Sequence, residues 1–180
     1  YLGGFIGGLL AVTIYIKKNN LNWLEVSDWV APMLLLGHGI GRIGCFLVGD
    51  DYGIPTNLPW GVSFPNGLPP TTTDSFSNQF PWVDISGCTP GLVSVHPTQI
   101  YEMSLYFIIF FFIKFRKRNQ SFKGELFCEY LFLGGLARFL VEFLRTNQPY
   151  LFELSGAQII SVIMMIIGIY FMSRLKKTNI

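Results

Sequence analysis

Charged residues are scarce in this sequence: only 13% of its 180 residues are Asp, Glu, Lys or Arg, whereas 51% are hydrophobic. A soluble domain usually carries about 25% charged residues. So little polar surface could not cover the apolar surface that a soluble fold would have to bury, which excludes an ordinary soluble domain. The apolar residues also fall in blocks near the ~20-residue length that spans the hydrocarbon core of a bilayer. The composition therefore predicts a membrane protein.

Cysteine and net charge are also low. The cysteines, Cys45, Cys88 and Cys128, are too few and too scattered for a disulfide framework or a zinc site. A net charge of only +2 gives no reason to expect nucleic acid as a partner. The two histidines and the acidic residues lack the spacing of metal ligands, so no metal is expected. Tyr1 already lies in an apolar run without a preceding charged segment, unlike a signal peptide, and we expect a fragment whose first helices are missing.

Five apolar blocks predict an all-α fold, a polytopic transmembrane helix bundle that forms a single membrane domain over residues 1–180. A long irregular loop separates the second block from the third. Ser27 and Asp28 resemble the N-cap of the second span, and Pro97 suits the first turn of the third. The expected spans lie at about 1–16, 29–48, 97–115, 124–144 and 155–173, with the loop at 49–96.

Ten of the thirteen Lys and Arg residues fall in three clusters. With five spans, the clusters follow the first, third and fifth, so all lie on one face of the membrane. Segment 49–96 contains no Lys or Arg. The positive-inside rule then predicts that the C-terminus is cytoplasmic and the loop 49–96 is outside. The clusters are Lys17 and Lys18; Lys114, Arg116, Lys117, Arg118 and Lys123; and Arg174, Lys176 and Lys177.

The remaining basic residues, Arg42, Arg138 and Arg145, lie in or beside predicted spans. An Arg near the centre of a membrane helix costs roughly 2.5–3.5 kcal/mol on insertion scales, and a carboxylate or an anionic ligand normally offsets this cost. Glu142 follows Arg138 by one helical turn, which permits either a structural ion pair or an anion site in which Glu142 orients Arg138. Arg42 has no acid at helical spacing except Asp50, and this favours the anion site.

Further polar residues accompany these arginines. His38 lies one turn before Arg42 on the same helix face, where it is either a structural residue or a base. Asp50 and Asp51 lie at the outer mouth, just after the second expected span, where they are either simply solvated or part of the anion site. Glycines four residues apart, such as Gly37 and Gly41, predict close helix approach.

The start of the third span also concentrates polar groups. His96, Gln99 and Glu102 are three residues apart and are expected to share one side. The positive end of the helix dipole would favour an anion there. Capping alone would explain one or two of these residues, but not all of them.

At these residues the sequence resembles the prolipoprotein diacylglyceryl transferase family, and the order and spacing agree from end to end. No single match is decisive, whereas the ordered set is specific. The matching segments are Gly3–Gly8, Glu25–Asp28, Ala31–Pro32, Gly41–Phe46 through Gly53, Pro59–Gly61, Phe64–Pro65, His96–Glu102, Arg138–Arg145, Gln158 and Ser161.

The resemblance implies a multi-pass enzyme of the bacterial inner membrane that needs no cofactor. It would transfer the diacylglyceryl group of phosphatidylglycerol to the thiol of the lipobox cysteine in a prolipoprotein signal peptide, and release glycerol phosphate. By this resemblance Arg42 contacts the lipid phosphate, and Arg138 is a second essential arginine beside Glu142. The candidate bases are His96 and His38. The substrate site would further include Asp50, Gly53, Gln99, Tyr101 and Arg145.

The sequence departs from the family pattern at four positions. Leu2 replaces a functional His, Cys45 and Val48 replace two signature Asn residues, and Asp50 replaces the usual Glu. His38 would then take over the role of the lost His. These departures leave room for a divergent membrane lipid transferase with another acceptor. A small-anion transporter and an inactive membrane scaffold are further alternatives, although a transporter predicts internal repeats that the sequence lacks.

Overall fold

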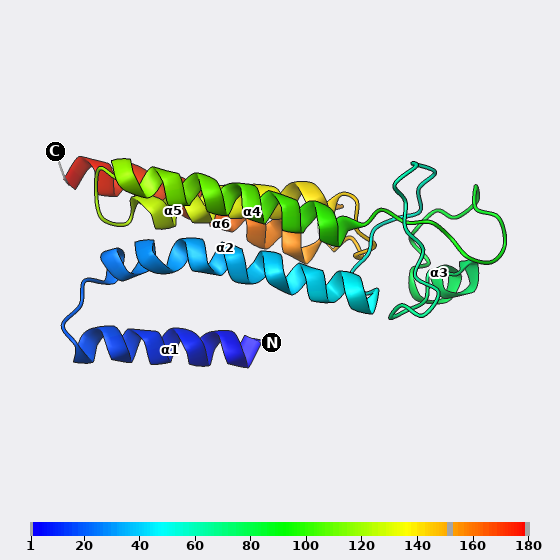
Figure 1. The fold of residues 1–180 in the computed structure, drawn as a ribbon, viewed down its shortest axis with the longest axis horizontal. Coiled ribbons are helices and arrows are strands. Elements are labelled where there is room, and N and C mark those ends of the chain that lie inside the picture. The colour runs from blue at the N-terminus through cyan, green and yellow to red at the C-terminus, as the bar shows by residue number, and fades with distance from the viewer. Residues whose placement is uncertain (1, 151–152, 179–180) are drawn as a thin grey trace.

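The structure, a computed structural model, describes residues 2–150 and 153–178, with side chains described from residue 7 to residue 177. Four long helices run side by side as a bundle, and a fifth, α1, lies alongside α2 (Figure 1). The described residues contain isolated β-bridges but no strand, which confirms the all-α fold class. The elements are α1 (Leu2–Lys18), α2 (Trp23–Val48), α3 (Thr73–Gln79), α4 (Thr98–Arg116), the 3-10 turn η1 (Lys117–Asn119), α5 (Glu125–Glu142) and α6 (Gly156–Thr178).

The helix α2 begins earlier than the sequence pattern predicted. Its N-cap is Asn22, whose side chain accepts hydrogen bonds from the backbone N–H groups of Leu24 and Glu25 at 3.0 and 3.3 Å. The prediction that Ser27 and Asp28 form this N-cap was therefore wrong, because both residues lie inside the helix. Asn22 satisfies the free N–H groups of the first turn, which is the task of an N-cap.

Asp28 caps a different helix. Its Oδ2 accepts a hydrogen bond from the backbone N–H of Gly124 at 2.6 Å, and its Oδ1 accepts one from Phe127 at 2.9 Å. These donors are free N–H groups at the start of α5, where the helix dipole also favours a negative charge. The carboxylate is buried and receives a further hydrogen bond from Gln120. Asp28 thus ties α2 to the beginning of α5.

The core of the bundle lies where α2, α4 and α5 meet. Buried apolar side chains from all three helices form one cluster. On the other side of α5, glycine brings two helices together: a Cβ at Gly135 would lie 2.9 Å from the backbone oxygen of Ser161 in α6. Nothing lies within 4 Å of such an atom at Gly37 or Gly41, so the close approach predicted there is absent among the described residues. The cluster comprises Ala31, Leu35, Tyr106, Ile109, Phe110, Ile113, Leu126, Tyr130 and Ala137.

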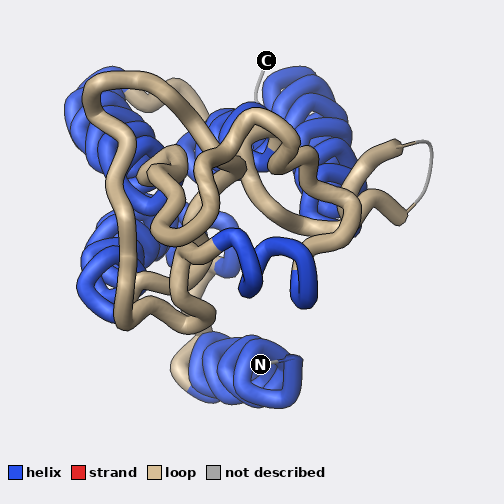
Figure 2. Tube along the Cα trace, turned by 90° about the vertical axis from the view of Figure 1, so that its right-hand side faces the viewer, coloured by secondary structure: helices blue, strands red, loops and turns tan. Residues whose placement is uncertain are grey.

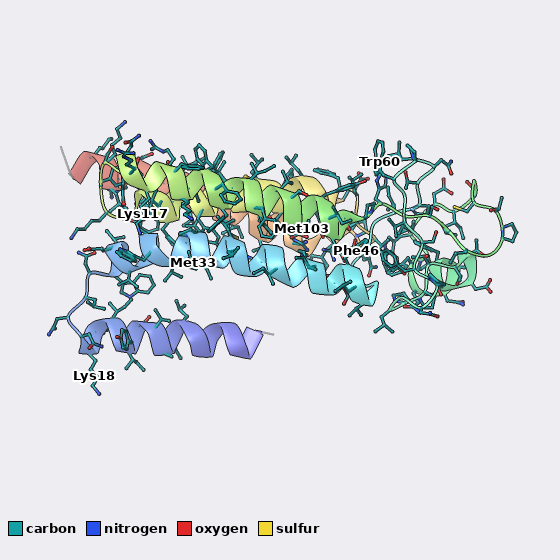
Figure 3. The ribbon with its side chains drawn as sticks, in the orientation of Figure 1. Lys18, Met33, Phe46, Trp60, Met103 and Lys117 are labelled. Carbon is teal, nitrogen blue, oxygen red and sulfur yellow. The ribbon has the colours of Figure 1, made fainter. Side chains whose placement is uncertain are left out.

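Three of the described helices, α2, the stretch from α4 through η1, and α6, are long and apolar enough to cross a membrane. The helix α1 has 17 residues, near the lower limit for a span, and α5 contains both acidic and basic residues. Five spans therefore remain a prediction. The three basic clusters lie at or just after the C-terminal ends of α1, α4 and α6, and these helices all end at the same end of the bundle (Figure 1). We call this the basic end; Lys18 and Lys117 lie there (Figure 3).

The loop 49–96 covers the opposite end of the bundle, which we call the loop end (Figure 2). It is ordered around its own small core, in which Tyr52, Phe76, Val93 and Val95 are buried. The loop is mostly irregular, as predicted, apart from the two-turn helix α3. At its start, Gly49 ends α2 with a positive φ of 72°, a conformation that glycine adopts without steric cost. The loop is thereby turned across the bundle and onto the start of α4.

Candidate functional site

The three arginines outside the basic clusters converge at the loop end on the carboxylate of Glu102 in α4. Its Oε2 lies 2.9 Å from Nε of Arg42 and 3.1 Å from Nη1 of Arg138. Nη1 of Arg145 lies 3.6 Å from the same oxygen. The Glu102 side chain is only 1% exposed, and its Oε1 also accepts a hydrogen bond from the hydroxyl of Tyr106 at 3.0 Å. One buried carboxylate therefore joins arginines from α2, α5 and the segment after α5.

Asp51, in the loop immediately after α2, is the second acid of the site. Its Oδ2 lies 2.7 Å from Nη1 of Arg42, and its Oδ1 is paired with Nη2 of Arg145. Partial burial raises the pKa of this carboxyl, but the guanidinium groups of Arg145 and Arg42 outweigh that effect and hold the pKa below its usual value. The side chain is nevertheless 44% exposed, which makes Asp51 the most accessible acid in contact with these arginines.

The first turn of α4 holds the backbone that carries Asp51. The hydroxyl of Thr98 donates a hydrogen bond to the backbone oxygen of Asp51 at 2.9 Å, and Nε2 of Gln99 donates one to the backbone oxygen of Asp50 at 2.6 Å. Both side chains are almost fully buried. Asp51 itself has a positive φ of 56°, which Asp tolerates better than most residues. Thr98 and Gln99 therefore fix the loop backbone from which the side chain of Asp51 projects.

Glu142, the last residue of α5, is the third acid. Its Oε2 lies 3.1 Å from Nη2 of Arg138, one helical turn earlier, as the spacing predicted. Its Oε1 accepts hydrogen bonds from Asn147 and from the hydroxyl of Ser155, both at 2.6 Å. One oxygen is thus anchored by neutral donors, while the other faces the arginines.

Arg145 lies beyond the end of α5 and is positioned by Gly53. The two residues form an isolated antiparallel bridge, and the neighbouring backbone N–H of Ile54 donates to the oxygen of Leu144 at 2.9 Å. A Cβ at Gly53 would collide with that same oxygen and would lie 2.8 Å from Cβ of His96. Because only glycine fits between these segments, Gly53 supports the site through close packing.

The site contains three arginines and three carboxylates, and each arginine contacts at least two of the acids. Along the sequence, Arg42 has no acid at helical spacing except Asp50, but the structure does not pair these two residues. The partners of Arg42 are Asp51 and Glu102, which helical spacing along α2 does not reveal. Buried arginines are costly in a bundle unless they are paired, and the pairing explains how all three are tolerated.

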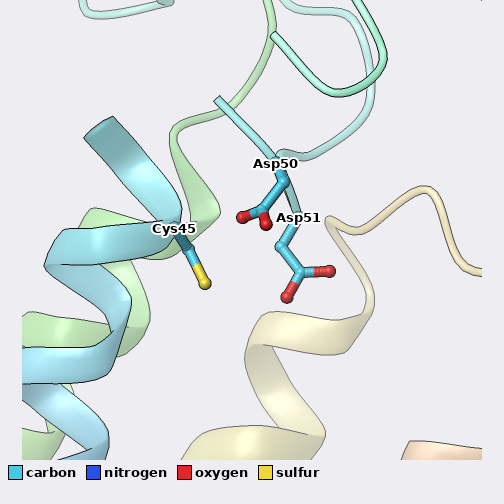
Figure 4. Close-up of side chains that lie close together, drawn as sticks. All are labelled: Cys45, Asp50 and Asp51. Carbon is cyan, nitrogen blue, oxygen red and sulfur yellow. The ribbon is translucent and has the colours of Figure 1, made fainter. Parts of the chain in front are cut away.

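Asp50 lies beside the arginine site, near Cys45 (Figure 4). Cys45, Asp50 and Asp51 each place one potential ligand atom within 4.8 Å of the others. Asp51 directs its two oxygens to Arg42 and Arg145, and a cation there would have to compete with both guanidinium groups. The Oδ1 atom of Asp50 is buried and makes no hydrogen bond within the described residues.

The two candidate bases lie in different surroundings. The ring of His38 stacks on the ring of Tyr106 at 5.4 Å between centroids, and Tyr106 in turn contacts Glu102. His96 instead lies just before α4, with Nδ1 3.3 Å from the hydroxyl of Tyr101. That hydroxyl also accepts a hydrogen bond from Nε1 of Trp60 at 2.7 Å. Burial lowers the pKa of His96 below its usual value, so the neutral form is favoured at neutral pH.

Two central residues, Glu102 and Asp51, are absent from the set of site residues predicted from the sequence. Glu102 was recognised only as part of a polar helix start, and Asp51 as one of two acids at the outer mouth. The signal that could have found them is charge balance, because three arginines in apolar surroundings require about as many acids nearby. The side chain of Leu2, at the position where the family usually has His, lies outside the described residues.

The fold and the site together define a multi-pass helical membrane protein with a partly buried cluster of paired arginines and carboxylates at one end. Comparison with known proteins identifies the family. The sequence profile described as "Prolipoprotein diacylglyceryl transferase" matches residues 1–174. The chain belongs to this family.

Individual relatives agree with this assignment. The chain is 38% identical over 169 residues to the phosphatidylglycerol–prolipoprotein diacylglyceryl transferase of Clostridium tetani, a match that covers 93% of the chain and 60% of the relative. It is 35% identical to the transferase of the same name from Clostridioides difficile, over 99% of the chain and 62% of the relative. It is 33% identical to the transferase of the same name from Finegoldia magna, over 97% of the chain and 60% of the relative. The chain thus spans about three fifths of the length of these relatives.

Proposed function

We propose that the full-length protein transfers the diacylglyceryl group of phosphatidylglycerol to the thiol of a lipobox cysteine in prolipoproteins and releases glycerol phosphate. The name that the relatives share describes them as transferases of a diacylglyceryl group between phosphatidylglycerol and prolipoprotein. The observation that carries the proposal for this chain is the convergence of Arg42, Arg138 and Arg145 at one end of the bundle. Guanidinium groups bind phosphate through paired hydrogen bonds, as they bind the carboxylates of this site.

Asp51 occupies the place that the lipid phosphate would take. Its two oxygens bridge Arg42 and Arg145, as two phosphate oxygens would. Glu102 and Glu142 are buried and have further hydrogen-bond partners, whereas Asp51 is the exposed acid. A phosphate can therefore displace the Asp51 carboxylate from the arginines while Glu102 and Glu142 keep them in position.

The surroundings of Arg145 favour an additional anion. Burial, together with the nearby charge of Arg138, lowers the pKa of Arg145 from its ordinary value, although Asp51 and Glu142 act in the opposite direction. The neighbouring acids thus do not fully offset the cost of burying this positive charge. A bound phosphate would supply the missing negative charge in a site that excludes most water.

The reaction requires a good leaving group and a thiolate. The sulfur of the lipobox cysteine attacks the glyceryl carbon that carries the phosphate, the C–O bond breaks, and glycerol phosphate leaves with the bonding electrons. Arg42 and Arg138 stabilise the charge on the departing phosphate, and Glu142 orients Arg138. His96 or His38 accepts the thiol proton, while Asp50, Gln99 and Tyr101 line the site.

The proposed location is the bacterial inner membrane, with the loop 49–96 outside and the C-terminus in the cytoplasm. The asymmetry of charge supports this orientation, because the Lys and Arg clusters lie at the basic end and the loop contains neither residue. The arginine site would then face the outer side, where the signal peptides of exported prolipoproteins present their cysteines.

The test is a transfer assay with the full-length protein in vesicles that contain phosphatidylglycerol and a lipobox peptide. We expect thioether-linked diacylglycerol on the peptide with the wild type and none with Arg42→Ala. The matched control is Arg116→Ala, because Arg116 is also paired with two glutamates, Glu125 and Glu129, but at the basic end. Transfer by the control and not by Arg42→Ala supports the proposal. A folded wild type without transfer would contradict it and would point to another acceptor.

A further inference from the structure

A cavity of about 310 Å³ lies beside the arginine site at the loop end. Its walls come from the loop 49–96, from the end of α5, and from the segment that leads into α6. This volume falls at the lower end of the range of small-molecule sites, which suits a small polar ligand. The residues that matter for its chemistry are Glu142, Arg145, Asn147, Ser155 and Gln158.

Glu142 and Arg145 both line this cavity, and each has a buried polar atom that makes no hydrogen bond within the described residues. These atoms are Nε of Arg145 and Oε2 of Glu142, and the latter has only its ion pair with Nη2 of Arg138 at 3.1 Å. Their side chains are only 4% and 1% exposed. The two atoms lie 3.8 Å apart, too far for a direct hydrogen bond. A hydroxyl group can satisfy both, because it accepts from the N–H of Arg145 and donates to the carboxylate of Glu142.

The carboxylate of Glu142 is held ready for such a ligand. Its other oxygen receives hydrogen bonds from Ser155 and Asn147, both at 2.6 Å. Ser155 is fixed in turn by a reciprocal cap at the start of α6: its N–H donates to Oε1 of Gln158 at 2.9 Å, and its hydroxyl oxygen accepts from the N–H of Gln158 at 3.2 Å. The rigid anchoring of one oxygen leaves the other in a defined position.

Arg145 connects the cavity to the proposed phosphate position. Its Nη atoms contact Asp51 and Glu102 in the arginine site, whereas its Nε lies nearest to Glu142, and both Arg145 and Glu142 line the cavity. A ligand with its phosphate on the Nη side and a hydroxyl group a few bonds away would therefore satisfy both faces of one guanidinium. Among lipid headgroups, a glycerol attached to the phosphate has this arrangement.

We propose that the cavity binds the terminal glycerol of the phosphatidylglycerol headgroup, with one of its hydroxyls bridging Nε of Arg145 and Oε2 of Glu142. This inference rests on the function proposed above. An ethanolamine headgroup fits less well, because its ammonium group donates hydrogen bonds but accepts none, and would leave the N–H of Arg145 unpaired. The cavity thus selects the donor lipid by its hydroxyl groups, separately from the arginines that bind the phosphate.

The experiment compares two donor lipids with the same acyl chains in the transfer assay with full-length protein: phosphatidylglycerol and phosphatidylpropanol, whose headgroup lacks hydroxyls. With the wild type, kcat/KM should be at least about tenfold lower for phosphatidylpropanol, the loss expected for leaving buried polar groups unpaired. No transfer from either lipid would refute the proposed function itself. Equal transfer from both lipids would refute the glycerol site while the function stands.

Ser155→Ala should lower kcat/KM for phosphatidylglycerol about tenfold and that for phosphatidylpropanol less than about threefold, because Glu142 loses an anchor. Ser155→Thr, which keeps the hydroxyl, should restore the discrimination. Ser173→Ala is the matched control, since Ser173 lies in α6 near the basic end and donates only to the backbone of Ile169.

Asn147→Ala removes the other hydrogen bond that anchors Glu142. Because Asn147 is exposed, this variant should fold, and it repeats the test if Ser155→Ala does not fold. If folded Ser155→Ala or Asn147→Ala still preferred phosphatidylglycerol over phosphatidylpropanol as strongly as the wild type does, the inference would be refuted. A change confined to the KM of the peptide would also refute it, by assigning the cavity to the acceptor.

Discussion

Nε of Arg42 in α2 lies 2.9 Å from Oε2 of Glu102 in α4, a residue sixty positions further along the chain. The same oxygen lies 3.1 Å from Nη1 of Arg138 in α5. Glu102 therefore compensates positive charge on two other helices at once. It holds the bundle together at the loop end and sets the spacing between the two arginines that are proposed to bind phosphate.

Replacement of Glu102 by Gln should strongly destabilise the bundle. The change removes the buried counter-charge that three largely buried arginines share, and the expected cost is about 3–5 kcal/mol, as for other broken buried ion pairs. Tyr106→Phe is the control, because it removes only one hydrogen bond to Glu102 and should cost about 1 kcal/mol. Unfolding in mixed micelles measures both. Equal losses in the two variants would show that Glu102 does not act through its charge.

Replacement of Asp51 by Asn should strengthen phosphate binding. The variant removes the carboxylate that bridges Arg42 and Arg145, and Asn tolerates the positive φ of this position. Inhibition of transfer by glycerol phosphate should become about three- to tenfold tighter, the equivalent of roughly 0.6–1.4 kcal/mol. Asp74→Asn, at an exposed acid in α3, should leave the inhibition constant unchanged. Weaker inhibition in Asp51→Asn would show that Asp51 supports the ligand and does not compete with it.

The pH dependence of transfer distinguishes the two candidate bases. Burial lowers the pKa of His96, so its neutral, proton-accepting form is lost only as the pH falls through a value below the usual 6.5. If His96 is the base, kcat/KM should fall with decreasing pH through that value, and His96→Gln should abolish this limb. An acid limb that persists in His96→Gln but disappears in His38→Gln would assign the base to His38. Because the pKa of Asp51 is held low, its ionisation should not contribute between about pH 5 and 8.

Gly53→Ala should displace the backbone that carries Arg145, although the Arg145 side chain itself is unchanged. The added methyl would collide with the backbone oxygen of Leu144 and lie 2.7 Å from Cγ2 of Thr98. We expect a loss of about 1–3 kcal/mol in stability, typical of overpacking, together with a loss of transfer. Gly87→Ala is the control, because nothing lies within 4 Å of the added atom. Full activity of Gly53→Ala would mean that the position of Arg145 tolerates a shift.

At the basic end, Asp28→Asn should destabilise the fold and leave the reaction intact. The variant weakens two hydrogen bonds from the start of α5 and one from Gln120, and it removes a charge that the helix dipole favours, at an expected cost of about 1–3 kcal/mol. Glu25→Gln removes only an exposed ion pair with Lys123 and should cost less than about 0.5 kcal/mol. Thermal unfolding and transfer at low temperature separate the two effects. Reduced transfer by folded Asp28→Asn would reveal coupling between the ends of the bundle.

The helices were predictable from the sequence, because each long apolar block can satisfy its backbone hydrogen bonds internally. The arginines were also predictable as site residues, since their cost in apolar surroundings marks them. Their partners were not, because Arg42 pairs with Glu102 across two helices and helical spacing reports only neighbours on one helix. The wrong N-cap of α2 has the same cause, because a contact between helices is not visible in the sequence. Asp28 does accept hydrogen bonds from free helix N–H groups, but these belong to the start of α5.

The segments that build the arginine site are synthesised in a fixed order. With α2 and α4 alone, the contacts seen in the folded chain would pair Arg42 with Asp51 and Glu102, so the site would carry one positive and two negative charges. Only the arrival of α5 and the residue after its end adds Arg138 and Arg145. We therefore expect the stable insertion of α4 to depend on the insertion of α5, which supplies the missing positive charge.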